Sequence, residues 1–168
     1  MTDRNVSSSR HQDPRLGESG PSSGDVLARR LTQVVAGVFI VVGVLGFIPG
    51  VTTDYDSLQL AGHESEAMLL GIFQVSVLHN VVHLLFGVVG LLMSARGVTA
   101  AAYLIGGGAV YLVLWVYGLV VGQEDQANFV PLNTADNWLH LGLGVGMIAL
   151  GLVALRAVRG AIGSQTPT

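Results

Sequence analysis

Long runs of apolar positions, separated by short polar segments, are the main pattern along this chain. A helix of about 20 apolar residues crosses a bilayer core about 30 Å thick. Lipid gives the backbone no hydrogen-bond partners, and the chain lacks the alternating ten-residue pattern of barrel strands, so helices are the expected spanning elements. The apolar runs lie at residues 31–48, 69–93, 99–121 and 137–155. The pattern predicts an all-α integral membrane protein, a four-helix bundle.

The two ends of the chain differ from these runs in composition. Residues 1–28 are rich in Ser, Gly, Pro, Asp and Arg and nearly lack large apolar side chains, so they bury too little surface to fold. They do not show the pattern of a secretory signal peptide. We expect a disordered cytoplasmic tail at 1–28, a transmembrane domain at 29–160 and a flexible tail at 161–168.

The charge distribution predicts how the helices are oriented. The apolar runs are flanked by Arg29, Arg30, Arg96, Arg156 and Arg159. The two longer connections, 50–68 and 122–136, contain no Arg but hold Asp54, Asp56, Glu64, Glu66, Glu124, Asp125 and Asp136. Basic residues stay on the cytoplasmic side of a membrane. We therefore expect a multi-pass protein of the cell (cytoplasmic) membrane with its N and C termini in the cytoplasm.

Composition excludes several kinds of chemistry. Only 11% of the residues are charged, against about 25% in an average soluble domain. The absence of cysteine excludes disulfides, thiolate metal sites and cysteine nucleophiles. Residues 106–108 are all glycine, but they lie within an apolar run with no Lys nearby, so they do not form a phosphate loop. We expect the protein to contact the lipid bilayer, to bind no nucleic acid and to have no enzyme activity. The sequence leaves open whether it forms a homo-oligomer or joins a larger membrane complex.

Glycines recur in the apolar runs. Gly142 and Gly146 form a GxxxG pair, and Gly87 and Gly90 lie in the run that contains two histidines. Small residues let helices approach closely in lipid, where no hydrophobic force drives them together. We expect these positions to form helix–helix contacts.

A polar stripe lies within the run at 69–93. At 100° per residue, Ser76, His79, Asn80, His83 and Gly87 fall within an arc of about 100° on one face of a helix. Polar side chains are costly in lipid and normally turn toward other helices. The stripe therefore predicts the internal face of this helix.

A third histidine is expected at the same depth. At about 1.5 Å per residue, His79 lies about 25 Å and His83 about 20 Å from Arg96, and His140 lies about 24 Å from Arg156. Asp136 and Asn137 come just before His140 in the sequence. The spacing of Asn133 and Asp136 is that of a capping box, which predicts Asn133 as a helix cap.

The chemistry of this polar layer has several interpretations. Three imidazoles at His79, His83 and His140 suit a metal ion, with Asp136 as a fourth ligand or an orienting group. Haem would take one axial histidine ligand from the run at 69–93 and one from the run at 137–155. Histidine also titrates near neutral pH, which suits a proton path or a small carrier. We favour interhelical hydrogen bonding, worth about 0.6 kcal/mol for each bond in a membrane.

An internal echo links two of the runs. His83-Leu-x-x-Gly87-Val recurs as His140-Leu-x-x-Gly144-Val. Two such hairpins would be related by a pseudo-two-fold axis along the membrane normal. The match is short, and a repeat is one interpretation of it.

Two sequence runs resemble a known family. His79-Asn80-x-x-His83-Leu84 and Asn133-Thr-Ala-Asp136-x-x-x-His140 are similar to those of uncharacterised bacterial membrane proteins, common in actinobacteria, described as domain of unknown function 4383. The resemblance spans about Arg30 to Leu155 and implies a four-helix integral membrane protein. It implies no activity, cofactor or substrate.

Three functional hypotheses follow from the sequence. The first is a non-enzymatic membrane protein, structural or accessory to a larger complex, in which the polar layer joins helices. The second is a metal- or haem-binding membrane protein that uses His79, His83 and His140. The third is a small carrier or proton path.

Overall fold

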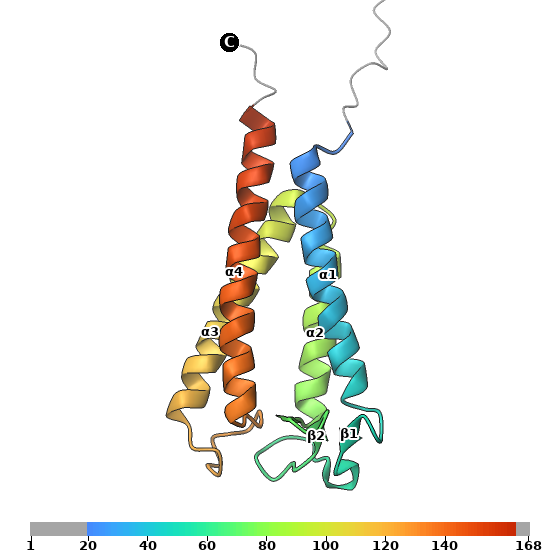
Figure 1. Ribbon diagram of the computed structural model, residues 1–168, viewed down its shortest axis with the longest axis vertical. Helices are drawn as coiled ribbons and strands as arrows, with labels where there is room; N and C mark the ends of the chain where they lie inside the picture. Colours follow the sequence, from blue (N-terminus) through green and yellow to red (C-terminus); the bar gives the residue numbers. More distant parts are fainter. Residues whose placement is uncertain (1–19, 164–168) are drawn as a thin grey trace, which may run out of the picture.

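The computed structural model describes residues 20–163, which form four long helices and one small sheet (Figure 1). The all-α class is confirmed. The helices are α1 (Ser23–Leu45), α2 (Val77–Met93), α3 (Gly97–Val120) and α4 (Thr134–Gly163). The strands are β1 (Thr52–Thr53), β2 (Met68–Leu69) and β3 (Phe73–Gln74), with a short 3-10 helix at Tyr55–Ser57. Residues 1–19 of the tail predicted at 1–28, and residues 164–168 of the tail predicted at 161–168, lie outside the described residues.

The helices run alternately up and down, so the connections divide between the two ends of the molecule (Figure 1). The start of α1, the α2–α3 turn and the end of α4 lie at one end, which carries all the arginines of the described residues. The small sheet and the α3–α4 connection lie at the other. The Arg29 side chain donates to the Ser94 carbonyl (3.1 Å), which ties α1 to the α2–α3 turn.

Three helices are long and apolar enough to cross a membrane: α1, α3 and the Thr134–Ala161 part of α4. The shorter α2 has 17 residues, about 25 Å of helix. The span predicted at 69–93 is therefore wrong in its first part, because residues 69–76 belong to the sheet and the segment before α2. The backbone is left-handed at Leu70 and Gly71, which makes the β2–β3 turn and ends any helix there.

The first and last helices are longer than the apolar runs predict. The N-terminal residue of α1 is Ser23, because Ser22 caps the helix and its Oγ accepts from the Asp25 amide (3.1 Å). Residues 23–28, assigned to the tail from composition, are helical. At the other end α4 continues past residue 155 to Gly163.

The helices pack as two hairpins. Within the described residues, α1 lies along α2 and α3 along α4, while α1 also contacts both α3 and α4. Buried residues of α1, α3 and α4 form one hydrophobic core, with Phe39, Leu104, Tyr111 and Met147 among its largest members, and partly buried Phe86 and Met93 of α2 pack against it. The sheet packs its own smaller apolar cluster of Ala67, Leu69 and Val75 against the end of α1.

Glycines divide into two groups by what surrounds them. A Cβ at Gly87 would meet the Ala36 carbonyl, and one at Gly144 would meet Leu112, so both permit the close helix contact that the sequence predicts. The expectation fails for the GxxxG pair. A Cβ at Gly142 or Gly146 would have no atom within 4 Å, because both glycines face away from α3.

Candidate functional site

The two hairpins repeat the same helix contacts. Asn80 of α2 packs where a side chain at Gly46 of α1 would lie, and Asn137 of α4 packs in the same way on Gly118 of α3. The Asn137 side chain also donates to the Gly118 carbonyl (2.9 Å). The sequence echo therefore extends to the asparagines, and it reflects equivalent packing in the two hairpins.

Aromatic rings follow the same repeat. The ring of Phe39 stacks on His83 with centroids 5.7 Å apart, and Tyr111 meets His140 edge-on at 5.2 Å. Phe39 and Tyr111 stack on each other at 5.4 Å, which joins the two hairpins. Phe39 precedes Gly46 by the same seven positions as Tyr111 precedes Gly118. His83 and His140 thus each pack against an aromatic ring of the preceding helix.

The helix starts are also equivalent. The Ser76 hydroxyl accepts from the His79 amide (3.1 Å), and the Asn133 side chain accepts from the Asp136 amide (2.9 Å). The Asn133 amide donates back to Asp136 Oδ2 (3.1 Å), which completes the predicted capping box. His79 and Asp136 therefore hold matching positions, and they are the chemical difference between the two hairpins at this layer.

The structure brings the predicted polar layer together at the sheet end of the helices. His79, His83, His140 and Asp136 are all buried, with 5%, 7%, 3% and 2% of their surface exposed. The His79 ring lies 4.6 Å from that of His83 and 6.3 Å from that of His140, between ring centroids. Ser76, Asn80 and Asn137 are buried beside them.

A pocket of about 200 Å³ opens at this layer. Its polar wall is formed by the three histidines and Asp136, and its apolar wall comes from α1, α4 and the sheet segment. The apolar lining residues are Val42, Leu45, Leu69, Leu70, Phe73, Val75 and Leu139. The pocket joins apolar walls to convergent polar groups, which is the usual character of a small-molecule site.

Several polar atoms of this layer are buried without a hydrogen-bond partner. They are Nδ1 of His79, Nδ1 of His140, Nδ2 of Asn80 and Oδ1 of Asn137. Within residues 20–163, none of the three imidazoles hydrogen-bonds a side chain of another helix. Leaving a buried polar group unpaired costs about 1–3 kcal/mol, so two unpaired imidazole nitrogens require an explanation.

The ring of His83 is held in one tautomer. Its Nδ1 lies 3.1 Å from the His79 carbonyl, which can only accept, so Nδ1 carries the hydrogen. In the neutral ring Nε2 is then an acceptor, and it has no partner among the described residues. The same backbone contact orients many ligand-binding histidines.

Asp136 links the two hairpins at the layer. Its Oδ2 accepts from the Gln74 amide of β3 (3.0 Å) as well as from Asn133. The other carboxyl oxygen, Oδ1, has no hydrogen-bond partner in the part of the chain that the structure describes. One oxygen thus fixes the sheet to the start of α4, and the other is free for a ligand.

Metal binding by His79, His83 and His140 stays a hypothesis, and the placement of their rings bears on it. Among residues 20–163, no group of three or more His, Cys, Asp or Glu side chains is placed to hold a metal ion. The rings of His79 and His83 are stacked with only 16° between their planes, so their nitrogens do not converge on one point. The layer is better suited to a ligand that takes separate hydrogen bonds.

Sequence reasoning missed the sheet segment and the aromatic partners. Leu69, Phe73 and Val75 form a pocket wall, but the sequence assigned all three to the membrane helix predicted at 69–93. Phe39 and Tyr111 could have been found by extending the echo to the preceding helices, since each lies seven positions before a glycine.

Comparison with known proteins identifies the family and no activity. The family described as "Domain of unknown function (DUF4383)" matches residues 29–153, and the chain belongs to this family. No curated protein matches the chain. No solved structure matches it either.

Proposed function

We propose that this member of the family is a non-enzymatic, multi-pass protein of the cytoplasmic membrane that binds a small ligand in the histidine pocket. The observation that carries the proposal is the pocket of about 200 Å³ whose polar wall holds the three histidines and Asp136, in a layer that also contains the unpaired, buried Nδ1 atoms of His79 and His140. Hydrogen bonding between helices would have given these nitrogens partners. A ligand site accounts for the unpaired nitrogens of this layer, because functional sites commonly cost stability.

Both termini are assigned to the cytoplasm on the positive-inside rule. All the arginines of residues 20–163 lie at the end opposite the sheet, whereas the acidic loops lie at the sheet end. The histidine pocket then faces the outer half of the bilayer. A reporter fused at Thr168 should be active in the cytoplasm, and a cysteine introduced at Ser57 should react with an impermeant reagent from outside; the reverse pattern would overturn the orientation.

Thermal unfolding of two variants in mild detergent tests the binding role. His140→Phe removes an unpaired polar group and keeps a ring against Tyr111, so the melting temperature should rise or stay unchanged. The matched control is Asn137→Ala, which removes an observed hydrogen bond to Gly118 and should lower it. If His140→Phe lowers the melting temperature as much as Asn137→Ala does, the layer serves helix association and the binding proposal fails.

The same purified protein separates the metal and carrier alternatives. Elemental analysis and a visible spectrum, after growth with metals and haem supplied, should show neither a stoichiometric metal nor a Soret band. A carrier or proton path would add solute- or pH-driven flux across vesicles that His83→Ala abolishes. Stoichiometric metal or haem would replace the proposed ligand with that group.

A further inference from the structure

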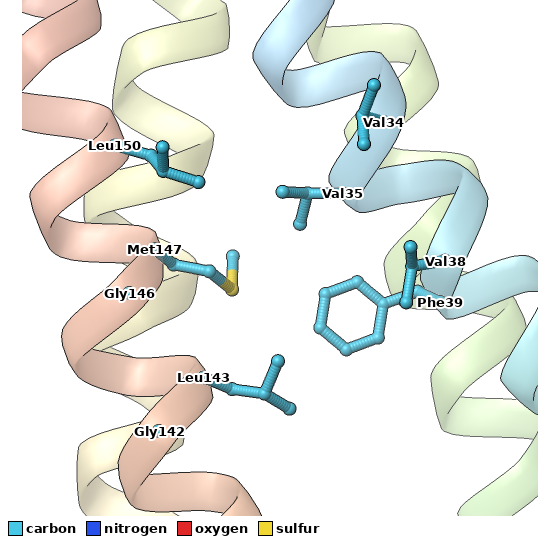
Figure 2. Close-up of a pocket in the computed structure, with 9 residues that line it drawn as sticks. All are labelled: Val34, Val35, Val38, Phe39, Gly142, Leu143, Gly146, Met147 and Leu150. Atoms are coloured by element: carbon cyan, nitrogen blue, oxygen red, sulfur yellow. The ribbon is translucent and has the colours of Figure 1, made fainter.

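A second pocket lies next to the histidine pocket along the same pair of helices. This second pocket, of about 210 Å³, also lies between α1 and α4 (Figure 2). Its lining residues are Val34, Val35, Val38, Phe39, Gly142, Leu143, Gly146, Met147 and Leu150. Along both helices these positions directly adjoin those of the histidine pocket, which begins at Val42 and at His140. The two pockets therefore lie end to end in one groove.

Glycine keeps this groove open. Val35 and Phe39 of α1 point across it toward Leu143 and Met147 of α4 (Figure 2). Gly142 and Gly146 on α4 are exposed, and a Cβ on either would touch nothing within 4 Å. The glycines thus serve no helix contact within the described residues. Their effect is to leave room along α4 for a narrow apolar group.

The polar end of the groove defines the head of its occupant. Phe39, at the junction, stacks on His83, and the buried His79 and His140 have unpaired nitrogens beyond it. The Asp136 carboxyl oxygen and the neutral His83 ring both offer acceptors, which a hydroxyl donor would satisfy. All the arginines of residues 20–163 lie at the opposite end, so a phosphate head would find no cation here.

The geometry points to a single-chain amphiphile with an uncharged hydroxyl head as the ligand of this groove. The head lies among His83, His140 and Asp136, and the hydrocarbon chain lies over Gly142 and Gly146. From Asp136 to Leu150 the groove follows about 21 Å of helix, enough for a long chain. The inference rests on the proposed function, since it names the ligand class of the same pocket. Long-chain alkyl alcohols, monoacylglycerols and prenyl alcohols share this chemistry.

A photoactivatable long-chain alcohol tests the inference directly. Purified full-length protein in nanodiscs is irradiated with a diazirine derivative of hexadecanol, and the labelled peptides are mapped by mass spectrometry. We expect labelling concentrated on the α1 and α4 residues that line the groove. Unlabelled hexadecanol should compete at least tenfold better than hexadecane, which lacks the hydroxyl donor, and than lysophosphatidylcholine, whose phosphate would find no cation here. Competition by geranylgeraniol and by monoolein distinguishes a prenyl from an acyl source.

Three variants separate the chain site from the head site. Gly146→Leu fills the groove and should reduce labelling at least tenfold, whereas Gly106→Leu adds the same side chain at an exposed α3 position with open space around it and should change nothing. His140→Phe should abolish the preference for the alcohol over hexadecane.

The outcomes distinguish the two proposals. If Gly146→Leu labels like the parent protein while His140→Phe loses the preference, the histidine pocket binds a ligand whose chain lies elsewhere, and only this inference falls. Labelling that spreads over all lipid-facing helices, with equal competition by hexadecane, overturns both the groove site and its hydroxyl head.

Discussion

The α1–α2 hairpin and the α3–α4 hairpin are built on the same contacts but differ where they meet the pocket. In each, an asparagine packs on a glycine and a histidine rests on an aromatic ring. Among their matching positions, the difference in ionisable chemistry at the pocket is His79 in the first hairpin and Asp136 in the second. The matching contacts give the two hairpins the same frame. The difference puts an imidazole at the pocket in the first hairpin and a carboxyl group in the second.

The connections of the two hairpins differ as well. The first carries the small sheet, and the second is a shorter segment without any described strand. The sheet covers the pocket from one side and is held to the second hairpin by the bond from the Gln74 amide to Asp136. The pocket is therefore assembled from both hairpins, although the apolar groove beyond it is formed by α1 and α4.

The largest expected effect comes from the glycines that hold each hairpin together. Gly87→Leu and Gly144→Leu each force a side chain into the preceding helix, so each should lower the free energy of unfolding by about 3 kcal/mol or more. Gly142→Leu, on the same helix as Gly144 but beside open space, is the control and should change it little. Chemical denaturation in detergent measures all three. Equal damage from Gly142→Leu and Gly144→Leu would contradict the assignment of the groove.

The next effect tests the difference between His79 and Asp136. Asp136→Ala leaves the Gln74 and Asn133 amides without their acceptor, so it should cost about 2–3 kcal/mol of stability. His79→Leu removes the unpaired Nδ1 together with the ring's backbone hydrogen bonds to Gln74 and Pro131, so it should cost less than Asp136→Ala. Melting curves of the two variants compare them. Similar losses would mean that both positions serve the same structural role.

A smaller effect is expected at the asparagines. Asn137→Ala removes one hydrogen bond to Gly118 and should cost about 1 kcal/mol, within the range of such bonds in membranes. Asn80→Ala removes a side chain whose Nδ2 has no partner, so its cost should come from lost packing alone. Chemical denaturation of the two single variants measures this asymmetry. A loss at Asn80 as large as that at Asn137 would contradict the hydrogen bond as the source of the difference.

Periodicity predicted the parts of this fold that depend on local sequence. The stripe on α2 could be derived because a helix repeats every 3.6 residues, and its residues His79, Asn80, His83 and Gly87 are buried. The capping box at Asn133 was also predictable, since both partners lie within one turn. The start of α1 was missed, although Ser22 and Asp25 have the spacing of a helix cap.

Contacts between distant segments could not be predicted in this way. Each strand of the sheet has two residues, which is too short for an alternation of apolar and polar positions to be recognised. Leu69 therefore cannot be distinguished in sequence from the apolar run that follows it. The GxxxG pair was misassigned because the motif does not say which face meets a helix. Only the packing of α3 on Gly144 shows that Gly142 and Gly146 face the groove.

The most direct test of the account is the melting-temperature shift that hexadecanol causes in the parent protein and in His140→Phe. The account predicts a shift in the parent, because a ligand that binds only the folded state stabilises it. It predicts no shift in the variant, whose melting temperature without ligand is equal to or above that of the parent. An equal shift in both proteins, or a variant that melts well below the parent without ligand, would contradict the claim that the histidine layer is a binding site.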